Sequence, residues 1–367
     1  MSEPAALGGP STFAFSRTVS VFWRHVFTVT VIAILASAYV VVRGTSDPEV
    51  SDFDQLWHGA RALIQGENPY QYVGPTGVFG WAPLYYPLPA MLLVSPLALL
   101  PLLAARAVFA AISAGVLAAA LLRDSPVRLL VFLSAPMFIA IGRGQWSPLL
   151  VAAAYFPSMA WVGLAKPNIA LAVLFGSRKP WSAVTSAVIG GAILIAVSFI
   201  IEPGWLASWL EALGRKRDGM SVLIHGGGLF VPLVLLRWRR PESRMLAALG
   251  SVPQTPGFYD TVPLIMVPRG FRETSFLVIA GNLALLVLVS GVGLRTEQIG
   301  PLYAERVLLW SSFLLYLPCV FMILRRPNDA RALPDAPIRK GLVDSAMLMA
   351  LLASAFFAIW ATLARYI

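Results

Sequence analysis

Charged residues are scarce in this chain. They make up 13% of its 367 residues, whereas soluble domains average roughly 25%. Hydrophobic residues make up 58% of the sequence, and apolar runs recur from Val26 to its end. This distribution excludes a soluble enzyme with a single membrane anchor, and it excludes an intrinsically disordered chain. We therefore expect an all-α polytopic membrane protein that forms a single domain over residues 1–367.

Cysteine is nearly absent as well. The single cysteine, Cys319, lies in an apolar run and has no partner for a disulfide within the chain, which excludes a disulfide scaffold. The formal net charge of +10 would suggest a nucleic-acid partner in a soluble protein, but loop arginines and lysines that orient a membrane protein explain it better. We expect no nucleic-acid partner. Zinc-ligand spacing, a phosphate-binding loop and a nucleotide fingerprint are also missing from the sequence.

Long uncharged runs predict helices that cross a membrane. A crossing needs about 20 mostly apolar residues. Runs of this kind are Val26–Val42, Trp181–Ile201, Thr274–Leu294, Val307–Leu324 and Ala346–Leu363. Shorter candidates are Ala107–Leu122, Leu129–Gly142 and Ser221–Leu236, and further apolar tracts are interrupted by proline or glycine. Together they predict about ten to thirteen membrane segments. Interrupted helices at membrane depth need protein or water to satisfy their backbone, so they tend to mark a site.

The first of these runs has a second interpretation. Ala36-Ser37-Ala38 resembles the cleavage site of a secretory signal peptide. However, the apolar stretch continues beyond this site to Val42, and the polar region before it is long for a signal. We therefore favour an uncleaved first helix.

Basic loops remain in the cytoplasm. With the N-terminus inside, the segments 1–25 and 325–340 are expected to be cytoplasmic. The polar segments 43–83 and 202–220 are then expected to lie outside the membrane.

The tract Tyr85–Leu100 leaves two topologies open. If it spans the membrane, Arg106 and Arg143 lie inside. If it is a re-entrant or juxtamembrane helix, Arg123 and Arg128 lie inside instead. Each topology places two of these basic residues inside, so the positive-inside rule does not choose between the two topologies.

Residues 51–64 predict an amphipathic helix just outside the first membrane run. Their apolar side chains recur at helical spacing, which suits the membrane interface. Asp54, His58 and Arg61 share another face of this helix because they are four and three residues apart.

Asp52, at the start of this helix, has two interpretations. Ser51 or Asp52 can cap the start of the helix. In the first interpretation, Asp52 is only this cap, and the aromatic residues that follow form an interface belt. In the second, a carboxylate beside a membrane exit acts as a general base that removes a proton from an acceptor hydroxyl. Aromatic faces nearby would then bind a sugar or a polyprenyl chain. The density of carboxylates and aromatic residues in one outer loop favours the second interpretation.

The pattern from Asp52 to Tyr70 reads Asp-Phe-x-x-x-Trp-x-x-Ala-Arg-Ala-Leu-x-x-Gly-x-x-Pro-Tyr, and Tyr85-Tyr86-Pro87 follows it. It resembles the signature of glycosyltransferase family 87, which contains polyprenol-phosphate-mannose-dependent mannosyltransferases with the GT-C membrane fold. Three later short motifs resemble those of the family, in the family's order: Gly144-Gln145, Lys166-Pro167 and Phe258-Tyr259-Asp260.

The resemblance implies a GT-C-like bundle with a juxtamembrane helix in its first extracytoplasmic loop. It implies that Asp52 is the catalytic base, with Asp54 as the nearest rival. The donor would be a polyprenyl-phosphate sugar, with mannose as the family's default, and the acceptor a lipid or glycan. Lys166 would stabilise the leaving phosphate, with Arg143 or His225 as further donors. The residues expected to bind substrate are His58, Arg61, Tyr70, Tyr85, Tyr86, Arg143, Gln145, Lys166, His225, Tyr259 and Asp260.

One carboxylate base without a second nucleophile favours inversion at the anomeric carbon. We expect no required cofactor, and a divalent cation held by Asp52 and Asp54 is the lower-ranked alternative. The expected location is the cytoplasmic (inner) membrane of a bacterium, with the active site on the periplasmic side.

Two other functions remain alternatives. A transporter or flippase of lipid-linked sugars would spread polar residues along several helices in paired halves, whereas the polar chemistry here gathers in one outer loop. The other alternative is an inactive structural subunit of an envelope-glycan complex. The presence of Asp52, Tyr70, Lys166 and Asp260 argues against it.

Overall fold

Helices and loops make up the part of the chain that the computed structural model describes, which is residues 12–46, 51–74, 77–79, 83–215, 219–255, 257–292, 301–329 and 342–363. Within these residues the only β-structure is two isolated bridges, between Val73 and Val78 and between Met220 and Gln254. The α-helices of the first half are α1 (Thr12–Ser46), α2 (Asp52–Ile64), α3 (Pro69–Tyr72), α4 (Leu88–Val94), α5 (Leu102–Leu122), α6 (Ala135–Gly142), α7 (Ser147–Tyr155) and α8 (Pro167–Phe175).

The α-helices of the second half are α9 (Pro180–Ile201), α10 (Trp205–Gly214), α11 (Pro241–Ser251), α12 (Gly270–Val292), α13 (Pro301–Ser311), α14 (Leu317–Leu324) and α15 (Leu342–Leu363). The 3₁₀ helices between them are η1 (Leu97–Leu99), η2 (Pro126–Leu133), η3 (Pro157–Ala165), η4 (Val222–Ile224), η5 (Gly226–Arg237) and η6 (Tyr259–Met266). A π-helical segment, η8 (Ser312–Tyr316), joins α13 to α14.

Six helices of the described chain are long and apolar enough to cross a membrane. They are Val21–Thr45 in α1, Leu102–Leu122, Pro180–Ile201, Gly270–Ser290 in α12, Ala304–Leu324 across α13 to α14, and Val343–Thr362 in α15. Large apolar side chains on these helices face outward, as lipid contact requires: Phe27 is 70% exposed and Trp181 is 83% exposed. The prediction of an all-α polytopic membrane protein is confirmed. The predicted total of segments and the GT-C arrangement stay predictions.

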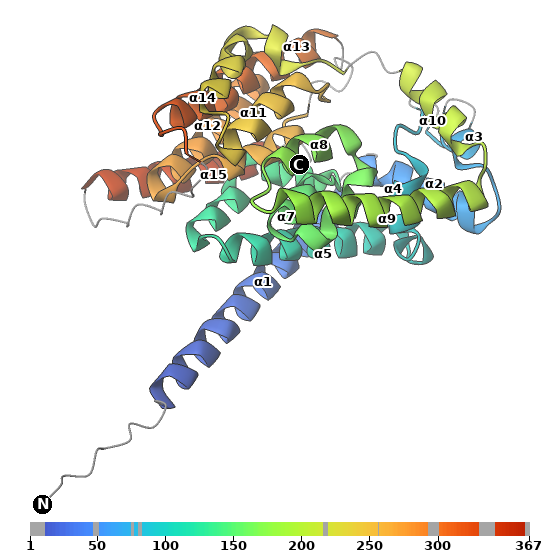
Figure 1. Cartoon of the computed structure of the whole chain (residues 1–367), viewed down its shortest axis with the longest axis horizontal. Helices are drawn as coiled ribbons and strands as arrows, with labels where there is room; N and C mark the ends of the chain where they lie inside the picture. Colours follow the sequence, from blue (N-terminus) through green and yellow to red (C-terminus); the bar gives the residue numbers. More distant parts are fainter. Residues whose placement is uncertain are drawn as a thin grey trace, which may run out of the picture.

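The first two long helices, α1 and α5, pack in opposite directions. Gly44 near the end of α1 lies against Leu103 at the start of α5, and Gly115 in the second half of α5 lies against Val29 and Ala33 of α1. The N-terminal part of α1 extends away from the other helices (Figure 1). α1 continues to Ser46, beyond the predicted end of this run at Val42.

The interrupted apolar tracts form short helices that begin at prolines. α7, η3 and α8 follow one another between residues 147 and 175, and each has a proline in its first turn. Proline suits a helix start because its missing N–H would have no intrahelical partner there. The break between η3 and α8 falls at Lys166, whose backbone is not helical. These breaks bring polar side chains into an otherwise apolar bundle.

The tract Tyr85–Leu100 does not form a spanning helix. α4 has 7 residues, which at 1.5 Å per residue corresponds to about 10 Å, against roughly 30 Å for the hydrocarbon core. The indole N–H of Trp57 in α2 donates to the carbonyl of Leu100 at 3.1 Å, so this tract lies against the amphipathic helix. The described tract therefore contains no spanning helix, and its position relative to the membrane stays a prediction.

Different ion pairs lie at the two ends of α5. Arg106 at its start pairs with Asp54 of α2. Just beyond its end, Asp124 pairs with Arg128 and Arg178. Figure 1 shows α2, α3 and α10 together on one side of the molecule, away from α12, α14 and α15.

The predicted loop segments are described in part. The first outer segment contains α2 and α3, and the second contains α10. Residues 1–11 of the predicted cytoplasmic N-terminus and residues 330–340 of the predicted loop 325–340 lie outside the described residues.

Candidate active site

The start of α2 presents Asp52 without using its carboxylate as a cap. Ser51 is the N-cap, and its hydroxyl accepts from the backbone N–H of Phe53. The carboxylate of Asp54 accepts from the backbone N–H of Ser51 at 2.9 Å, which completes a capping box. The interpretation of Asp52 as the helix cap is therefore wrong, because Ser51 and Asp54 satisfy the first turn between them.

Asp54 holds α2 against α5. Its side chain is 2% exposed, and both of its oxygens accept from the guanidinium of Arg106, with Nε at 2.7 Å from Oδ1. A buried ion pair of this kind needs both partners, since removing one leaves an uncompensated charge. Asp54 is thus occupied by Arg106 and by the capping box.

Asp52 belongs to a different chain of hydrogen bonds, which we call the relay: Asp52, Gln145, Lys166 and Asp260. Gln145 Nε2 donates to Asp52 Oδ2, and Gln145 Oε1 accepts from Lys166 Nζ at 3.1 Å. Lys166 Nζ also donates to Asp260 Oδ1 at 2.5 Å. The backbone N–H of Thr255 donates to the other oxygen of Asp260 at 3.0 Å. Residues far apart in the sequence thus form one continuous polar network.

The backbone on either side of the relay explains its geometry. Gly144 has a φ of +61°, and a Cβ there would lie 2.5 Å from Cβ of Phe53, so only glycine allows this approach to α2. The backbone N–H of Phe53 donates to the carbonyl of Arg143 at 3.3 Å. Lys166 lies at the break before α8, and Asp260 lies in the first turn of η6.

Tyrosines surround the relay. The ammonium of Lys166 lies 4.7 Å from the ring centroid of Tyr259, and the side chain of Tyr86 is buried. The Tyr85–Tyr86 backbone is held from two sides: the Tyr70 hydroxyl donates to the Tyr86 carbonyl at 3.1 Å, and the Trp209 indole donates to the Tyr85 carbonyl at 3.0 Å. Trp209 lies on α10, so the second outer segment contacts the site.

Three predicted site residues have their described contacts elsewhere. His58 packs between aromatic rings, with centroids 4.8 Å from Trp57 and 5.2 Å from Phe79. Arg61 lies over the Trp57 ring, 5.0 Å from its centroid. His225 lies between η4 and η5, where its Nε2 is buried and has no hydrogen-bond partner among the described residues. The structure does not bring these three to the relay.

The carboxylates do not form a metal-ligand set. Within the described residues no group of three or more metal-ligating side chains lies together. A cation held by both Asp52 and Asp54 would have to displace Arg106 from Asp54. Asp52 and Asp54 are therefore poorly placed to hold a divalent cation together.

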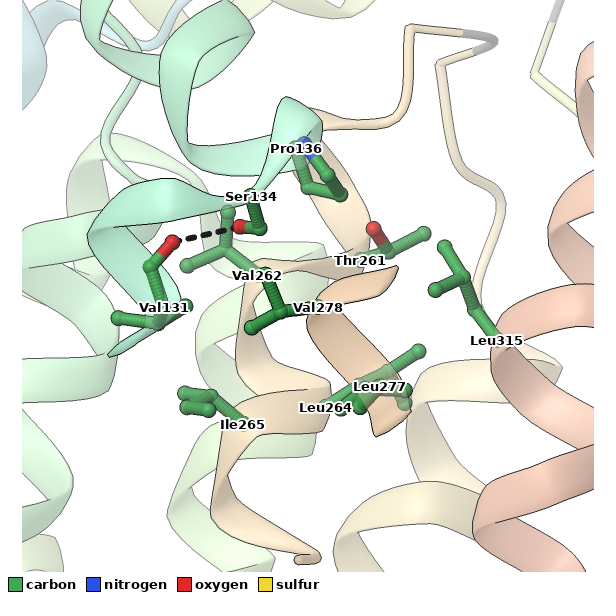
Figure 2. Close-up of a pocket in the computed structure, with 10 residues that line it drawn as sticks. All are labelled: Val131, Ser134, Pro136, Thr261, Val262, Leu264, Ile265, Leu277, Val278 and Leu315. Atoms are coloured by element: carbon green, nitrogen blue, oxygen red, sulfur yellow. Dashed lines mark hydrogen bonds between the residues drawn. The ribbon is translucent and has the colours of Figure 1, made fainter. Parts of the chain in front are cut away.

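A small apolar cavity lies against η6 (Figure 2) and contains about 300 Å³ of space between atoms, part of it open to the surface. Its two hydroxyls bond to nearby backbone carbonyls, Ser134 to Val131 at 2.6 Å and Thr261 to Phe258 at 2.5 Å. A 3₁₀ helix repeats every three residues, so Asp260 faces a different direction from the residues of η6 that line this cavity. The surface of the cavity is therefore almost entirely apolar, and both of its hydroxyl hydrogens are already donated.

Arg106 and Trp209 are the residues of this region that sequence reasoning did not assign to the site. A signal existed for Arg106, because a charge in the first turn of an apolar helix needs a partner. The signal did not identify that partner as Asp54.

No family model, curated protein or solved structure matches the chain.

We predict that Arg106→Ala lowers the free energy of unfolding by about 3–5 kcal/mol, because the Asp54 carboxylate is left buried and unpaired. The matched control is Arg215→Ala, which breaks an exposed ion pair with Glu211 and is expected to cost about 0–1 kcal/mol. Denaturant unfolding in detergent measures both. Equal effects of the two variants would show that the Asp54–Arg106 pair does not hold α2.

We predict that the stability contribution of His58 depends on pH. Burial lowers the pKa of His58 below its usual value of 6.5, and neighbouring Arg61 and Arg106 lower it further against the opposing effect of Asp54. Below pH 6.5 the unfolded chain binds a proton that the folded protein does not, so stability falls as the pH decreases through this range. His58→Gln is expected to reduce the loss of thermal stability between about pH 7 and pH 5. His25→Gln, at an exposed position of α1, is expected to keep the wild-type loss, and identical pH profiles for all three proteins would contradict the prediction.

Proposed function

We propose that this protein is a membrane glycosyltransferase. It moves a hexose, with mannose as the first candidate, from a polyprenyl phosphate to a lipid or glycan acceptor, with inversion at the anomeric carbon. The observation that carries the proposal is the relay, in which a carboxylate and a lysine are held by one glutamine amide. The resemblance of the Asp52–Tyr70 pattern to glycosyltransferase family 87 supports the same function.

Asp52 is the carboxylate best suited to act as the base. The other two nearby carboxylates each contact a cation directly, Asp54 through Arg106 and Asp260 through Lys166. The oxygens of Asp54 and one oxygen of Asp260 are thus already engaged by these cations. Asp52 is instead bonded to a neutral amide through Oδ2. Its Oδ1 can therefore accept the proton of an acceptor hydroxyl.

Lys166 is suited to the leaving group. An ammonium has three donors, and its hydrogen bonds in the structure go to Gln145 and Asp260. The third N–H can donate to a phosphate oxygen. In the proposed step, the acceptor oxygen forms a bond to the anomeric carbon as its proton moves to Asp52. The bond from the anomeric carbon to the phosphate oxygen breaks, and the polyprenyl phosphate leaves with its charge facing Lys166.

The distribution of basic residues supports an extracytoplasmic site. Arginines concentrate beyond the end of α5 that lies away from Asp52. Arg128 and Arg178 pair with Asp124 there, and Arg240, Arg269 and Arg326 lie around Glu242. Basic segments remain in the cytoplasm, which favours the Asp52 end facing the opposite side. We propose the cytoplasmic membrane of a bacterium as the location, with the relay on the periplasmic side.

We predict that Asp52→Asn lowers the rate of sugar transfer by about 10²–10⁴-fold, the usual contribution of a general base. Asparagine keeps an oxygen that accepts from Gln145, so the fold is expected to persist. The assay uses full-length protein in proteoliposomes with labelled polyprenyl-phosphate mannose and extracted envelope lipids as acceptors.

Glu211→Gln, at an exposed position of α10, is the control and is expected to keep the wild-type rate. A wild-type rate for Asp52→Asn would remove this residue as the base. Translocation of the labelled donor without transfer would identify a flippase. An absence of both activities in the wild-type protein would favour a structural subunit.

A further inference from the structure

A second network of charged side chains lies beyond the C-terminal end of α5, which is the end remote from Asp52. It contains five arginines and three carboxylates: Arg128, Arg178, Arg240, Arg269 and Arg326, with Asp124, Glu242 and Glu273. Asp124 forms ion pairs with Arg128 and Arg178, whereas Glu242 accepts from Arg240 at 2.9 Å and from Arg326 at 3.1 Å. Arg326 also pairs with Glu273 at 2.5 Å. The proposed transfer reaction does not use this network.

Arg269 is the least satisfied member of the network. Its Nε is buried and has no hydrogen-bond partner among the described residues. Its nearest carboxylate oxygen, on Glu242, lies 3.9 Å from Nη2, which is too far for a hydrogen bond. Burial lowers the pKa of Arg269, and the nearby charges of Arg128 and Arg178 lower it further, although Glu242 and Asp124 oppose them. An anion at this position would stabilise the buried guanidinium.

A cleft gives access to Arg269. It encloses about 330 Å³ of space between atoms, part of it open to the surface, and Arg178 and Arg269 line it together with Tyr155, Met266 and Glu242. Glu242 is 3% exposed and already bonded to Arg240 and Arg326. The side chain of Arg178 is 45% exposed, so a ligand can reach it from outside.

The cleft lies at the ends of membrane-spanning helices. Arg178 is two residues before α9, and Arg269 directly precedes α12. Both of these helices are long and apolar enough to cross a membrane. Side chains at such helix ends are at the level of lipid headgroups, where phosphates are abundant. Arginine binds phosphate with two parallel hydrogen bonds, which a pair of guanidiniums in one cleft favours.

We propose that the cleft formed by Arg178 and Arg269 binds a phosphate-bearing anion, supplied by a lipid headgroup or by soluble phosphate. This site is separate from the relay, and the proposal does not depend on glycosyl transfer.

The experiment measures thermal unfolding of the purified full-length protein in a neutral detergent. Phosphatidic acid is compared with diacylglycerol of the same acyl chains, so that the pair differs only in the phosphate. Phosphatidic acid is expected to raise the melting temperature, whereas diacylglycerol is not. Inorganic phosphate alone is the third probe. An equal shift with inorganic phosphate identifies a soluble anion as sufficient, and a shift with phosphatidic acid alone identifies the lipid headgroup.

The variants are Arg178→Gln and Arg269→Gln. Each is expected to weaken the affinity for the effective probe about tenfold, the loss of one charge-assisted hydrogen bond. Arg239→Gln is the matched control, because Arg239 is exposed and lies over Trp238 outside the cleft, and it is expected to keep the wild-type shift. If Arg269→Gln fails to fold, the affinity of Arg178→Gln alone tests the proposal, because Arg178 is half-exposed. Equal shifts with phosphatidic acid and diacylglycerol together with no shift from inorganic phosphate would overturn the proposal. An unchanged affinity of Arg178→Gln for the effective probe would also overturn it.

Discussion

A lysine among apolar helices needs partners, and the environment of Lys166 determines how the centre of this molecule is arranged. Its side chain is only 11% exposed. Burying an ammonium without compensation is strongly unfavourable, so its donors must be met by acceptors from the surrounding segments. Gln145 and Asp260 provide these acceptors. Both lie where the helices are interrupted, because only there can polar side chains and non-helical backbone meet without exposing unsatisfied groups to lipid.

Because buried cations need paired carboxylates, the three carboxylates near the site have different partners. Asp54 compensates Arg106 and fixes the amphipathic helix, and Asp260 compensates Lys166. Asp52 lies beside them in the structure but is bonded to the amide of Gln145. A glutamine can join a carboxylate to an ammonium because it donates through nitrogen and accepts through oxygen. The proposal that Asp52 acts as a base, and that Lys166 receives a phosphate, depends on this separation of roles.

Much of this arrangement could be predicted from the sequence. Apolar runs and helical spacing identified the long helices and the amphipathic helix after the first of them. The motif residues Asp52, Gln145, Lys166 and Asp260 were expected in one site, and the structure connects them by hydrogen bonds. Aromatic residues near Tyr86 were expected there as well.

The remainder depends on contacts that local patterns do not encode. The pairing of Asp54 with Arg106 joins residues 52 positions apart, and no periodicity links them. His58 belongs to the same short helix as Asp52, yet its ring packs against Trp57 and Phe79. The path of the chain from Tyr85 to Leu100 was open from charge alone, because either topology exposes two basic residues on the cytoplasmic side. The contact between Trp57 and the Leu100 carbonyl, which favours one of them, is tertiary.

A double-mutant cycle tests most directly whether Gln145 joins Asp52 to Lys166. Asp52→Ala, Lys166→Met and their combination are compared by free energy of unfolding, once with Gln145 present and once in a Gln145→Leu background. With Gln145 present we expect a coupling energy of about 0.5–3 kcal/mol, as for residues in one hydrogen-bond network. In the Gln145→Leu background we expect additivity within about 0.5 kcal/mol. Additive effects in both backgrounds would contradict the connected site on which the account rests.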